Sequence, residues 1–335
     1  MTKAAPRRLA LYWLLVIFVL LVAGCVSRPS TRGSVARAVP TPHRLSGIAA
    51  SPGCALSRPS EAGRTFTLNV RSVPAASEGR RWRQYIVHVP AGYKPSVPGP
   101  LVLYFHGAGG GAAGASADSG WSTLADRDRF LVVYPQGLPF GPGGPAAWAS
   151  AGPIDYGIDD LGFVRSLLTQ VEHHFCVQPG AVFATGMSSG GGMAGYLACA
   201  LSGQIAAAAP VAGNHYTLTK LGCHPSQSIA LLEIHGTADS IVPYQGIPAS
   251  LDPQWPLPSI PAWIAAWANL DRCPGQPSSR TIADGQTLVA YPHCHAGTTV
   301  ELYRLNGGGH TWPATLAGEP TDDVIFRFFL AHRRD

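Results

Sequence analysis

A serine flanked by glycines is the residue of this 335-residue chain best suited to nucleophilic chemistry. The segment 186–190, Gly-Met-Ser-Ser-Gly, matches the pattern G-x-S-x-G and lies between an apolar run at 181–185 and a run of small residues that favours a helix. A sharp strand-to-helix turn needs glycine here, because a Cβ atom would clash with neighbouring backbone. The pentapeptide alone is weak evidence in a glycine-rich chain. Its context is what favours Ser188, rather than its neighbour Ser189, as the nucleophile.

A serine hydroxyl is a weak nucleophile unless a base accepts its proton and an acidic group orients that base. Asp239 follows an apolar run at 231–234, and His310 follows a β-rich run at 299–305. The order Ser, Asp, His along the chain is the order of the α/β-hydrolase fold, and ligands bind at the carboxyl ends of such strands. We therefore expect Ser188, Asp239 and His310 to be the nucleophile, the orienting acid and the general base of an acyl transfer.

Other histidines and aspartates offer alternatives with weaker sequence context. His215 is the strongest alternative base, but it precedes the expected acid and follows no comparable strand. His106 and His235 each precede a glycine after a strand, which favours a role in bracing loops. Asp252 and Asp271 are alternative acids. Any such aspartate can also have the purely structural role of forming a turn.

A glycine-rich loop follows the apolar run at 101–105. The segment 106–111 lacks the Lys-Ser/Thr of a phosphate-binding P-loop and has no G-x-G-x-x-G pattern with an acidic partner. It is better suited to donate backbone N–H groups to an oxyanion. We expect the N–H of Ala108, or of Gly109, to act with that of Ser189. This chemistry needs no metal and no organic cofactor.

Large aromatic residues are candidates for contact with a substrate. Trp148 and Trp312 are the two we expect to bind substrate, and Trp121 and Trp255 are further candidates for the same pocket. A large aromatic residue is more often part of the core or its rim.

The elements that must position these residues alternate along the chain. Apolar or β-branched runs predict strands at 65–70, 84–90, 101–105, 130–134, 181–185, 205–211, 231–234 and 299–305. Helical periodicity or composition predicts helices at 158–175, 189–201, 261–270 and 322–332, the last with Thr321 as N-cap. The expected fold class is α/β: a mostly parallel, eight-stranded, doubly wound sheet flanked by helices, in a single catalytic domain at 52–335.

The N-terminal segment has the pattern of an export signal. Lys3, Arg7 and Arg8 precede an apolar stretch at 9–22 that ends in Val-Ala-Gly-Cys. We expect residues 1–25 to be a lipoprotein signal peptide whose lipidated Cys25 anchors the protein to a membrane, followed by a flexible tether at 26–51. The alternatives are a plain signal peptide or an uncleaved anchor helix.

Cysteine usage fits an oxidising compartment. With Cys25 set aside, six cysteines remain, and they allow fifteen pairings that sequence alone does not decide. We favour Cys273–Cys294 and Cys199–Cys223, which leaves Cys54–Cys176. The alternative is a metal site around 293–295, where histidines flank Cys294.

Charge argues against a nucleic-acid partner. The formal net charge is +5, but three of the 24 basic residues lie in the first eight positions, and the remainder is close to neutral. No basic patch is interleaved with aromatic residues.

Six ordered segments resemble the polyhydroxybutyrate depolymerase / feruloyl esterase family of secreted esterases. They lie at 100–107, 133–137, 159–163, 184–194, 234–239 and 308–313, within a resemblance that covers 54–313. In that family the residues matching Ser188, Asp239 and His310 form the triad. The resemblance implies an ester substrate: a polyester, a hydroxycinnamoyl ester of plant polysaccharide or an acetyl ester. Many members have Asn where this chain has Ser189, which should alter the pocket and not abolish the chemistry. A cell-envelope acyltransferase with the same triad and a non-catalytic surface binding protein remain the alternatives.

Overall fold

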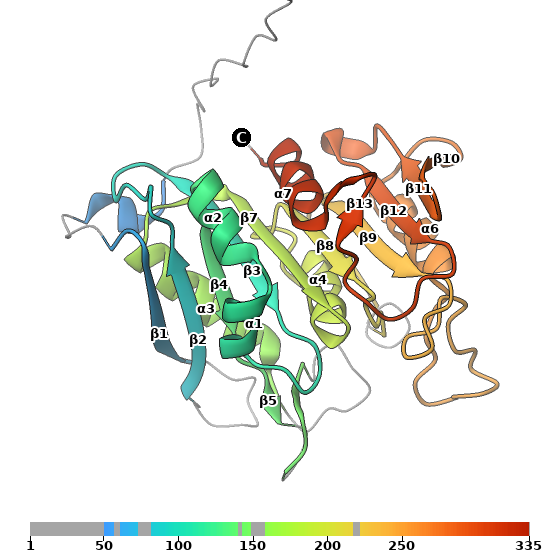
Figure 1. Ribbon diagram of the computed structural model, residues 1–335, viewed down its shortest axis with the longest axis horizontal. Helices are drawn as coiled ribbons and strands as arrows, with labels where there is room; N and C mark the ends of the chain where they lie inside the picture. Colours follow the sequence, from blue (N-terminus) through green and yellow to red (C-terminus); the bar gives the residue numbers. More distant parts are fainter. Residues whose placement is uncertain are drawn as a thin grey trace, which may run out of the picture. The chain divides into compact units, whose positions relative to one another are not determined.

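Ten strands form one sheet in the computed structural model, which describes residues 50–56, 61–72, 82–139, 143–148, 158–216 and 222–334. The strand order is β1-β2-β4-β3-β7-β8-β9-β12-β11-β10 (Figure 1). The strands from β4 to β12 in this order run parallel, and an antiparallel pair extends the sheet at each edge. This is the predicted α/β class, widened at one edge.

The strands of the sheet are β1 Arg64–Arg71, β2 Trp82–Val89, β3 Gly99–Phe105, β4 Leu131–Pro135, β7 Val177–Met187, β8 Ala207–Val211, β9 Ala230–Gly236, β10 Ser278–Ala283, β11 Gln286–Tyr291 and β12 Val300–Leu305. The helices are α1 Ala112–Asp118, α2 Trp121–Asp128, α3 Asp160–His174, α4 Ser189–Ala200, α6 Ile260–Leu270 and α7 Thr321–Ala331. Two small ribbons pair β5 Leu138–Pro139 with β6 Ala146–Ala147 and β13 Thr315–Leu316 with β14 Glu319–Pro320.

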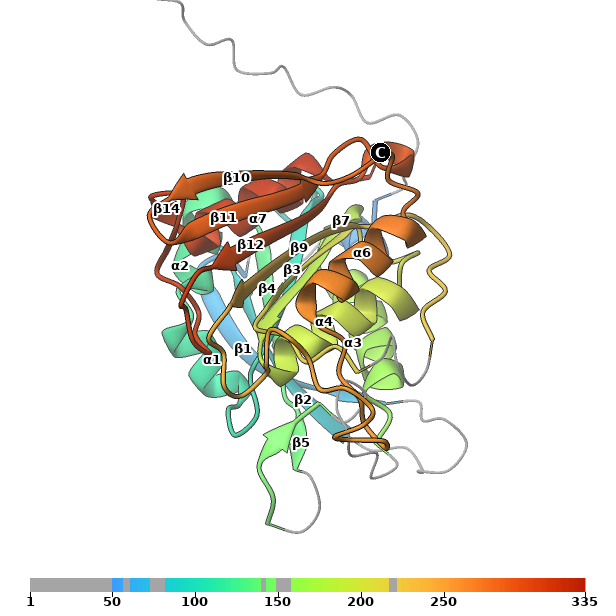
Figure 2. The same cartoon turned by 90° about the vertical axis from the view of Figure 1, so that its right-hand side faces the viewer.

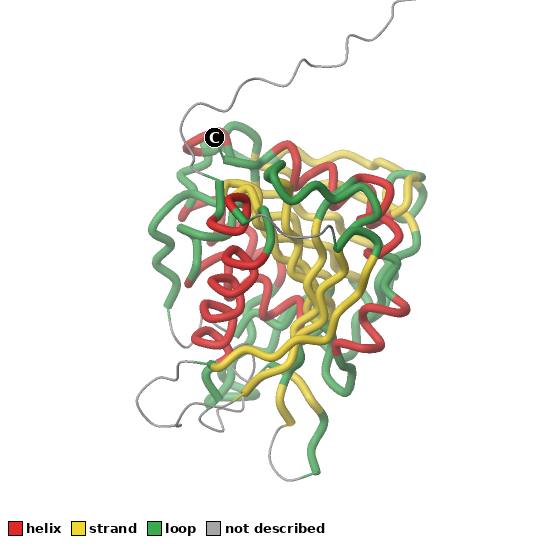
Figure 3. The backbone as a smooth tube through the Cα atoms, turned by 90° about the vertical axis from the view of Figure 1, so that its left-hand side faces the viewer, coloured by secondary structure: helices red, strands yellow, loops and turns green. Residues whose placement is uncertain are grey.

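Helices cover both faces of the sheet because its central strands are apolar on both sides. On β3, Leu101 and Leu103 belong to the core beneath α3, α4 and α6, whereas Val102 belongs to the core beneath α1, α2 and α7. This alternation follows from the two-residue period of a strand. The two helical layers are visible in Figure 2, and Figure 3 shows them on either side of the strands from the β1 edge.

Two predictions about elements need correction. Thr321 is the first residue of α7 and not its N-cap, which is Pro320; the Thr321 hydroxyl donates to the carbonyl of Pro313. The sheet also has two more strands than predicted, because β10 and β11 form a hairpin around Asp284-Gly285. An Asp-Gly turn with Gly285 at φ +69° is a strong hairpin signal that the strand prediction passed over.

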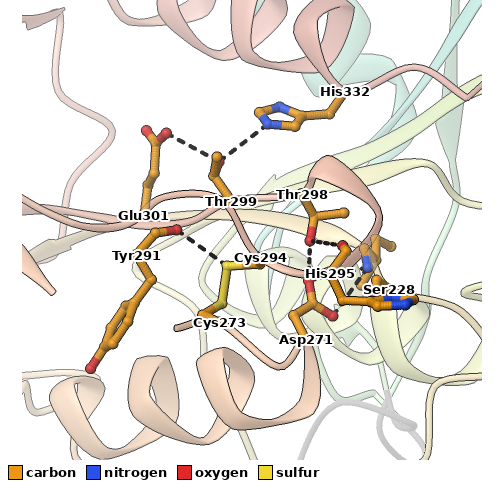
Figure 4. The surroundings of a disulfide bond; sticks show 11 residues. Ser228, Asp271, Cys273, Tyr291, Cys294, His295, Thr298, Thr299, Glu301 and His332 are labelled. Carbon is orange, nitrogen blue, oxygen red and sulfur yellow. Dashed lines mark hydrogen bonds between the residues drawn. A yellow bond between two sulfur atoms is a disulfide. The ribbon is translucent and has the colours of Figure 1, made fainter. Parts of the chain in front are cut away.

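Three disulfides confirm the favoured pairing: Cys54–Cys176, Cys199–Cys223 and Cys273–Cys294. Figure 4 shows the last of these beside Asp271, Thr298 and His295. Since Cys294 is bonded to Cys273, it is not available as a metal ligand. Within the described residues, no cluster of three or more His, Cys, Asp or Glu side chains could hold a metal ion.

The predicted signal peptide, the lipidation site Cys25 and most of the tether lie outside the described residues. In the part of the chain that the structure describes, no helix is long and apolar enough to cross a membrane.

Candidate active site

Ser188 lies at a strained turn between β7 and α4. Its φ and ψ are 58° and −122°, a region that residues with a side chain rarely adopt. A Cβ atom at Gly186 or Gly190 would overlap the carbonyl oxygen of Phe105, so only glycine allows the turn to pack against the end of β3. The backbone N–H of Ser188 donates to the Val211 carbonyl at 2.9 Å, which fixes the turn to β8 as well. The hydroxyl is thus presented by a rigid elbow, as the sequence pattern predicts.

Asp239 and His310 are in direct contact. The Nδ1 atom of His310 lies 2.8 Å from Oδ2 of Asp239, whose carboxylate is completely buried, while the His310 side chain is 17 % exposed. The other carboxylate oxygen, Oδ1, accepts the backbone N–H groups of Ile241 and Val242, each at 2.8 Å. A carboxylate only accepts, so Nδ1 of His310 carries the proton and Nε2 is left to take one.

The loops that carry this pair are fastened to each other. Thr237 N–H donates to the Leu305 carbonyl and Ala238 N–H to the Gly308 carbonyl, both at 2.9 Å. In return Gly307 N–H donates to the Thr237 hydroxyl at 2.8 Å. The loops after β9 and β12 therefore form one hydrogen-bonded unit that sets the position of the acid relative to the base.

The structure brings Asp239 and His310 together, and among the described residues no hydrogen bond joins the Ser188 hydroxyl to His310. Both Ser188 and His310 are partly exposed beyond the carboxyl ends of parallel strands, with β8 and β9 between their strands. Hydrogen bonds of this kind are often long in unliganded enzymes and shorten when substrate binds.

In the glycine-rich loop after β3, the structure distinguishes between Ala108 and Gly109 as the oxyanion donor. The N–H of Gly109 donates to the Ala146 carbonyl at 2.8 Å and is therefore occupied. Within the described residues, the N–H of the exposed Ala108 has no acceptor. Ser189 is the first residue of α4, where backbone N–H groups have no partner inside the helix. A Cβ atom at Gly107 would lie 3.5 Å from Cβ of Ser188, which places this loop beside the elbow.

His106 braces this loop, as the sequence predicts. Its Nε2 accepts the N–H of Gly137 at 3.0 Å, so its Nδ1 carries the proton that faces the Gly107 carbonyl at 2.8 Å. Burial lowers the pKa of His106, which keeps the ring neutral in this role.

Trp148 does not have the substrate-facing position that we predicted. It is completely buried, its ring packs edge-on against Phe105, and its indole N–H donates to the His106 carbonyl at 2.8 Å. Trp148 has no surface that a substrate could touch, and it supports the glycine-rich loop through its bond to His106. Sequence alone cannot distinguish this from a pocket wall, because both use a large aromatic residue.

Trp312 ties the His310 loop to α7. Its indole N–H donates to Oδ1 of Asp322 at 3.0 Å, and its ring lies 5.6 Å from that of Tyr104. Burial raises the pKa of Asp322 to about 6. Trp312 is partly exposed, so it retains surface for a ligand.

The alternative bases and acids all have other partners. Asp252 accepts the N–H groups of Gln254 and Trp255 in a turn. Asp271 accepts the N–H of Ile229 at the amino end of β9, away from the elbow. His215 and His235 both contact Glu233, a residue to which we assigned no role from the sequence. The sequence does contain a signal for Glu233, which is a charged residue inside an apolar strand. Such a residue is rarely buried without charged partners.

Comparisons with known proteins find several esterases, although no family model matches the chain. The chain is 32 % identical to feruloyl esterase B of Piromyces equi, over 68 % of this chain and 42 % of that protein. It is 32 % identical to feruloyl esterase C of Emericella nidulans, over 49 % of this chain and 57 % of that protein. The chain therefore spans about half the length of these two relatives. It is 30 % identical to the putative esterase NocK of Nocardia uniformis subsp. tsuyamanensis, over 74 % of each chain.

Solved structures confirm the fold. An acetyl xylan esterase from Aspergillus awamori superposes with a TM-score of 0.58 at 18 % identity, covering 79 % of this chain and 99 % of that one. An S-formylglutathione hydrolase from Agrobacterium tumefaciens gives a TM-score of 0.51 at 14 % identity, covering 82 % and 98 %. With its strand order, its elbow and these relatives, the chain belongs to the feruloyl esterase-like family of the α/β-hydrolases.

Proposed function

We propose that this protein is a serine carboxylic-ester hydrolase, with Ser188 as nucleophile, His310 as general base and Asp239 as the acid that orients it. The observation that supports the proposal most strongly is the strained Ser188 elbow at the same sheet edge as His310 and its buried partner Asp239. A strained backbone at an exposed hydroxyl costs free energy, and it persists where the conformation serves a reaction.

The reaction has two acyl-transfer steps. His310 Nε2 takes the proton of the Ser188 hydroxyl as Ser188 Oγ attacks the ester carbonyl carbon and forms a tetrahedral oxyanion. His310 then gives that proton to the leaving alcohol as the ester C–O bond breaks. Water, activated by the same imidazole, hydrolyses the acyl-enzyme and returns Ser188 to its starting state.

Backbone N–H groups of Ala108 and Ser189 stabilise the oxyanion. Each such donor is typically worth about 3 kcal/mol in the transition state. Ala108 N–H has no acceptor within the described residues, and the α4 N-terminus adds the positive end of its dipole.

The relatives support one substrate class over the others. Because feruloyl esterases are among the relatives, we propose hydroxycinnamoyl esters as the substrate. Acetyl and hydroxybutyrate esters are the other candidates. Trp312 is the residue we propose for contact with the acyl or aromatic group. Three disulfides support an exported protein, and we propose that Cys25 carries the lipid that anchors it.

Ser188→Ala tests the proposal in a p-nitrophenyl acetate assay with the full chain. We expect kcat to fall by about 10⁴ to 10⁶, with an unchanged thermal unfolding curve. Ser279→Ala, which removes an exposed hydroxyl on the edge strand β10, is the matched control and should keep wild-type kcat. Turnover by the Ser188 variant at the wild-type rate would remove Ser188 from the mechanism. A panel of feruloyl, acetyl and hydroxybutyrate esters then ranks the substrates by kcat/KM.

A further inference from the structure

A line of buried ionisable side chains continues behind Asp239, away from His310. His235 Nε2 lies 3.4 Å from Oδ2 of Asp239, and His235 Nδ1 lies 2.8 Å from Oε1 of Glu233. The other oxygen of Glu233 lies 3.1 Å from Nε2 of His215. The side chains of Glu233 and His235 are completely buried, and that of His215 is 2 % exposed. The reaction scheme above uses none of these three residues.

Both ring nitrogens of His235 face atoms that accept protons. Besides Asp239, Nε2 lies 2.9 Å from the carbonyl oxygen of Val242, which has no proton to give, so Nε2 must carry one. The protonation of Nδ1 then depends on whether Glu233 is ionised.

The contacts of Glu233 fit a carboxylate. Its two oxygens receive Nε2 of His215, Nδ1 of His235 and the backbone N–H of Gly213, the last at 3.4 Å. A protonated carboxyl would have to donate to one of these groups, whereas a carboxylate accepts from all three. Burial alone would raise the pKa of Glu233, but its contacts with His215 and His235 outweigh burial and lower it.

The surroundings of the two histidines shift their pKa values in opposite directions. Burial lowers the pKa of His215, whose ring stacks on Trp263 at 3.5 Å, and a neutral ring still donates one proton to Glu233. Burial opposes charge on His235 too, but the hydrogen bond and charge of Glu233, the Val242 carbonyl and Asp239 raise its pKa.

We propose that His235 is a doubly protonated imidazolium at neutral pH, held by Glu233, and that it is a positioning residue for Asp239. This inference rests on the proposed function, since it assigns His235 a task in the Ser188–His310–Asp239 reaction. The cation attracts the carboxylate of Asp239 and holds its Oδ2 atom, which also contacts His310. Its positive charge therefore lies close to the imidazole that has to accept the proton of Ser188.

Other charged or titratable groups around His235 come from two strands and two loops. Glu233 lies on the same strand, β9; His215 lies in the loop after β8; Asp239 lies in the loop after β9. Tyr244, in that same loop, has its ring 6.1 Å from the imidazole, and Arg304 on β12 is the register partner of His235. Asp239 in turn contacts His310. Glu233 and Asp239 are the carboxylates in contact with the His235 ring among the described residues, one at each nitrogen.

Nitrogen-15 NMR of the histidine side chains in the full chain tests the charge directly. We expect one histidine with protons on both nitrogens throughout pH 6 to 8, and its signals should disappear in His235→Gln. Glu233→Gln should cost that ring its second proton within the same pH range. A His235 ring with one protonated nitrogen at pH 7 in the wild type would overturn the proposal. This reading does not depend on activity, so it stands apart from the outcome of Ser188→Ala.

The pH profile of kcat/KM tests the positioning role. In His235→Gln the positive charge near His310 is gone, so the acidic limb should move to higher pH by about one unit. A residue that only fills space would change kcat or stability and leave that limb in place, which would contradict the proposal. His332→Gln is the control, because His332 is a partly buried histidine at the amino end of β12, where it contacts Thr299 and the Phe328 carbonyl. Its acidic limb should coincide with that of the wild type.

Discussion

Two buried carboxylates beside β9 have pKa values that are shifted in opposite directions. Glu233 lies in the middle of the strand and is completely buried, and its contacts with two imidazoles lower its pKa against the effect of burial. Asp271 follows helix α6 and accepts the N–H of Ile229 at the amino end of β9; it is also completely buried, and burial raises its pKa to about 6. The hydrogen-bond donors to Asp271 are the Thr298 hydroxyl and the Ile229 N–H, which are neutral. Both side chains are completely buried, so the difference lies in what they contact: two imidazoles in one case, a hydroxyl and a backbone N–H in the other.

The carboxyl edge of the parallel strands differs from the amino end of β9. At the carboxyl edge, glycines and charged side chains hold a strained serine after β7 and a carboxylate–imidazole pair after β9 and β12. At the amino end, a disulfide joins Cys273 to Cys294 next to Asp271, and His295 N–H donates to the Asp271 carbonyl (Figure 4). Changes at the first end should alter rate, and changes at the second should alter stability.

The largest expected effect is on catalysis. Asp239→Asn should lower kcat by about 10⁴, because an amide no longer fixes the His310 tautomer with its Nδ1 proton inward. Asp271→Asn is the matched change at the other end of β9 and should leave kcat within about twofold, as expected for a site that does not touch the reacting atoms. Steady-state kinetics on both variants provides the measurement. Similar losses of kcat in the two would erase the distinction between the ends.

A smaller effect is expected from the disulfide at the amino end. The double variant Cys273→Ala, Cys294→Ala opens a loop with a sequence separation of 21, and the free energy of unfolding should fall by about 3 kcal/mol. The kcat of the folded fraction should not change. Guanidinium unfolding curves and kinetics on the same samples measure both. A drop in kcat without loss of stability would mean that the amino end also shapes the site.

The smallest effect concerns pH. The folded protein binds the Asp271 proton more tightly than the unfolded chain, so the contribution of Asp271 to stability is greatest below pH 3.8 and is lost as pH rises through about 6. The Asp271→Asn variant does not lose this stability, because asparagine has no proton to release. From pH 4 to pH 7 the Tm of the wild type should therefore fall relative to the variant by about 4–8 °C, the equivalent of roughly 2 kcal/mol.

Comparing the two proteins at each pH cancels the other groups. Asp322, whose pKa burial also raises to about 6, is present in both. Differential scanning calorimetry gives the two Tm curves. A constant difference between them from pH 4 to pH 7 would show that burial of Asp271 does not shift its titration.

The sequence predicted the elements that have strong local signals. Helix α3 has apolar residues at helical spacing and Asp159 as its N-cap, and its predicted range differs from the observed one by two residues or fewer at each end. Helices α1 and α2 were not predicted, because α1 consists mainly of alanine, glycine and serine and has no apolar period. Its position is set by long-range contacts, such as the Ala112 N–H bonded to Gln136 Oε1.

The candidate site divides in the same way. The order Ser188, Asp239, His310 and the strand ends could be predicted from local patterns. The choice of Ala108 rather than Gly109 as donor could not, because it depends on the Ala146 carbonyl, which occupies the Gly109 N–H from 37 positions away. The positioning role that we propose for His235 could not be predicted from the sequence either. It depends on Val242 and Glu233 lying on either side of one ring.

The close packing of Gly186 and Gly190 against the Phe105 carbonyl has a consequence for engineering. The Ser188 hydroxyl cannot be moved by a substitution at either glycine, since a Cβ atom there would overlap the Phe105 carbonyl at the end of β3. A library aimed at new acyl groups should therefore leave Gly186 and Gly190 untouched.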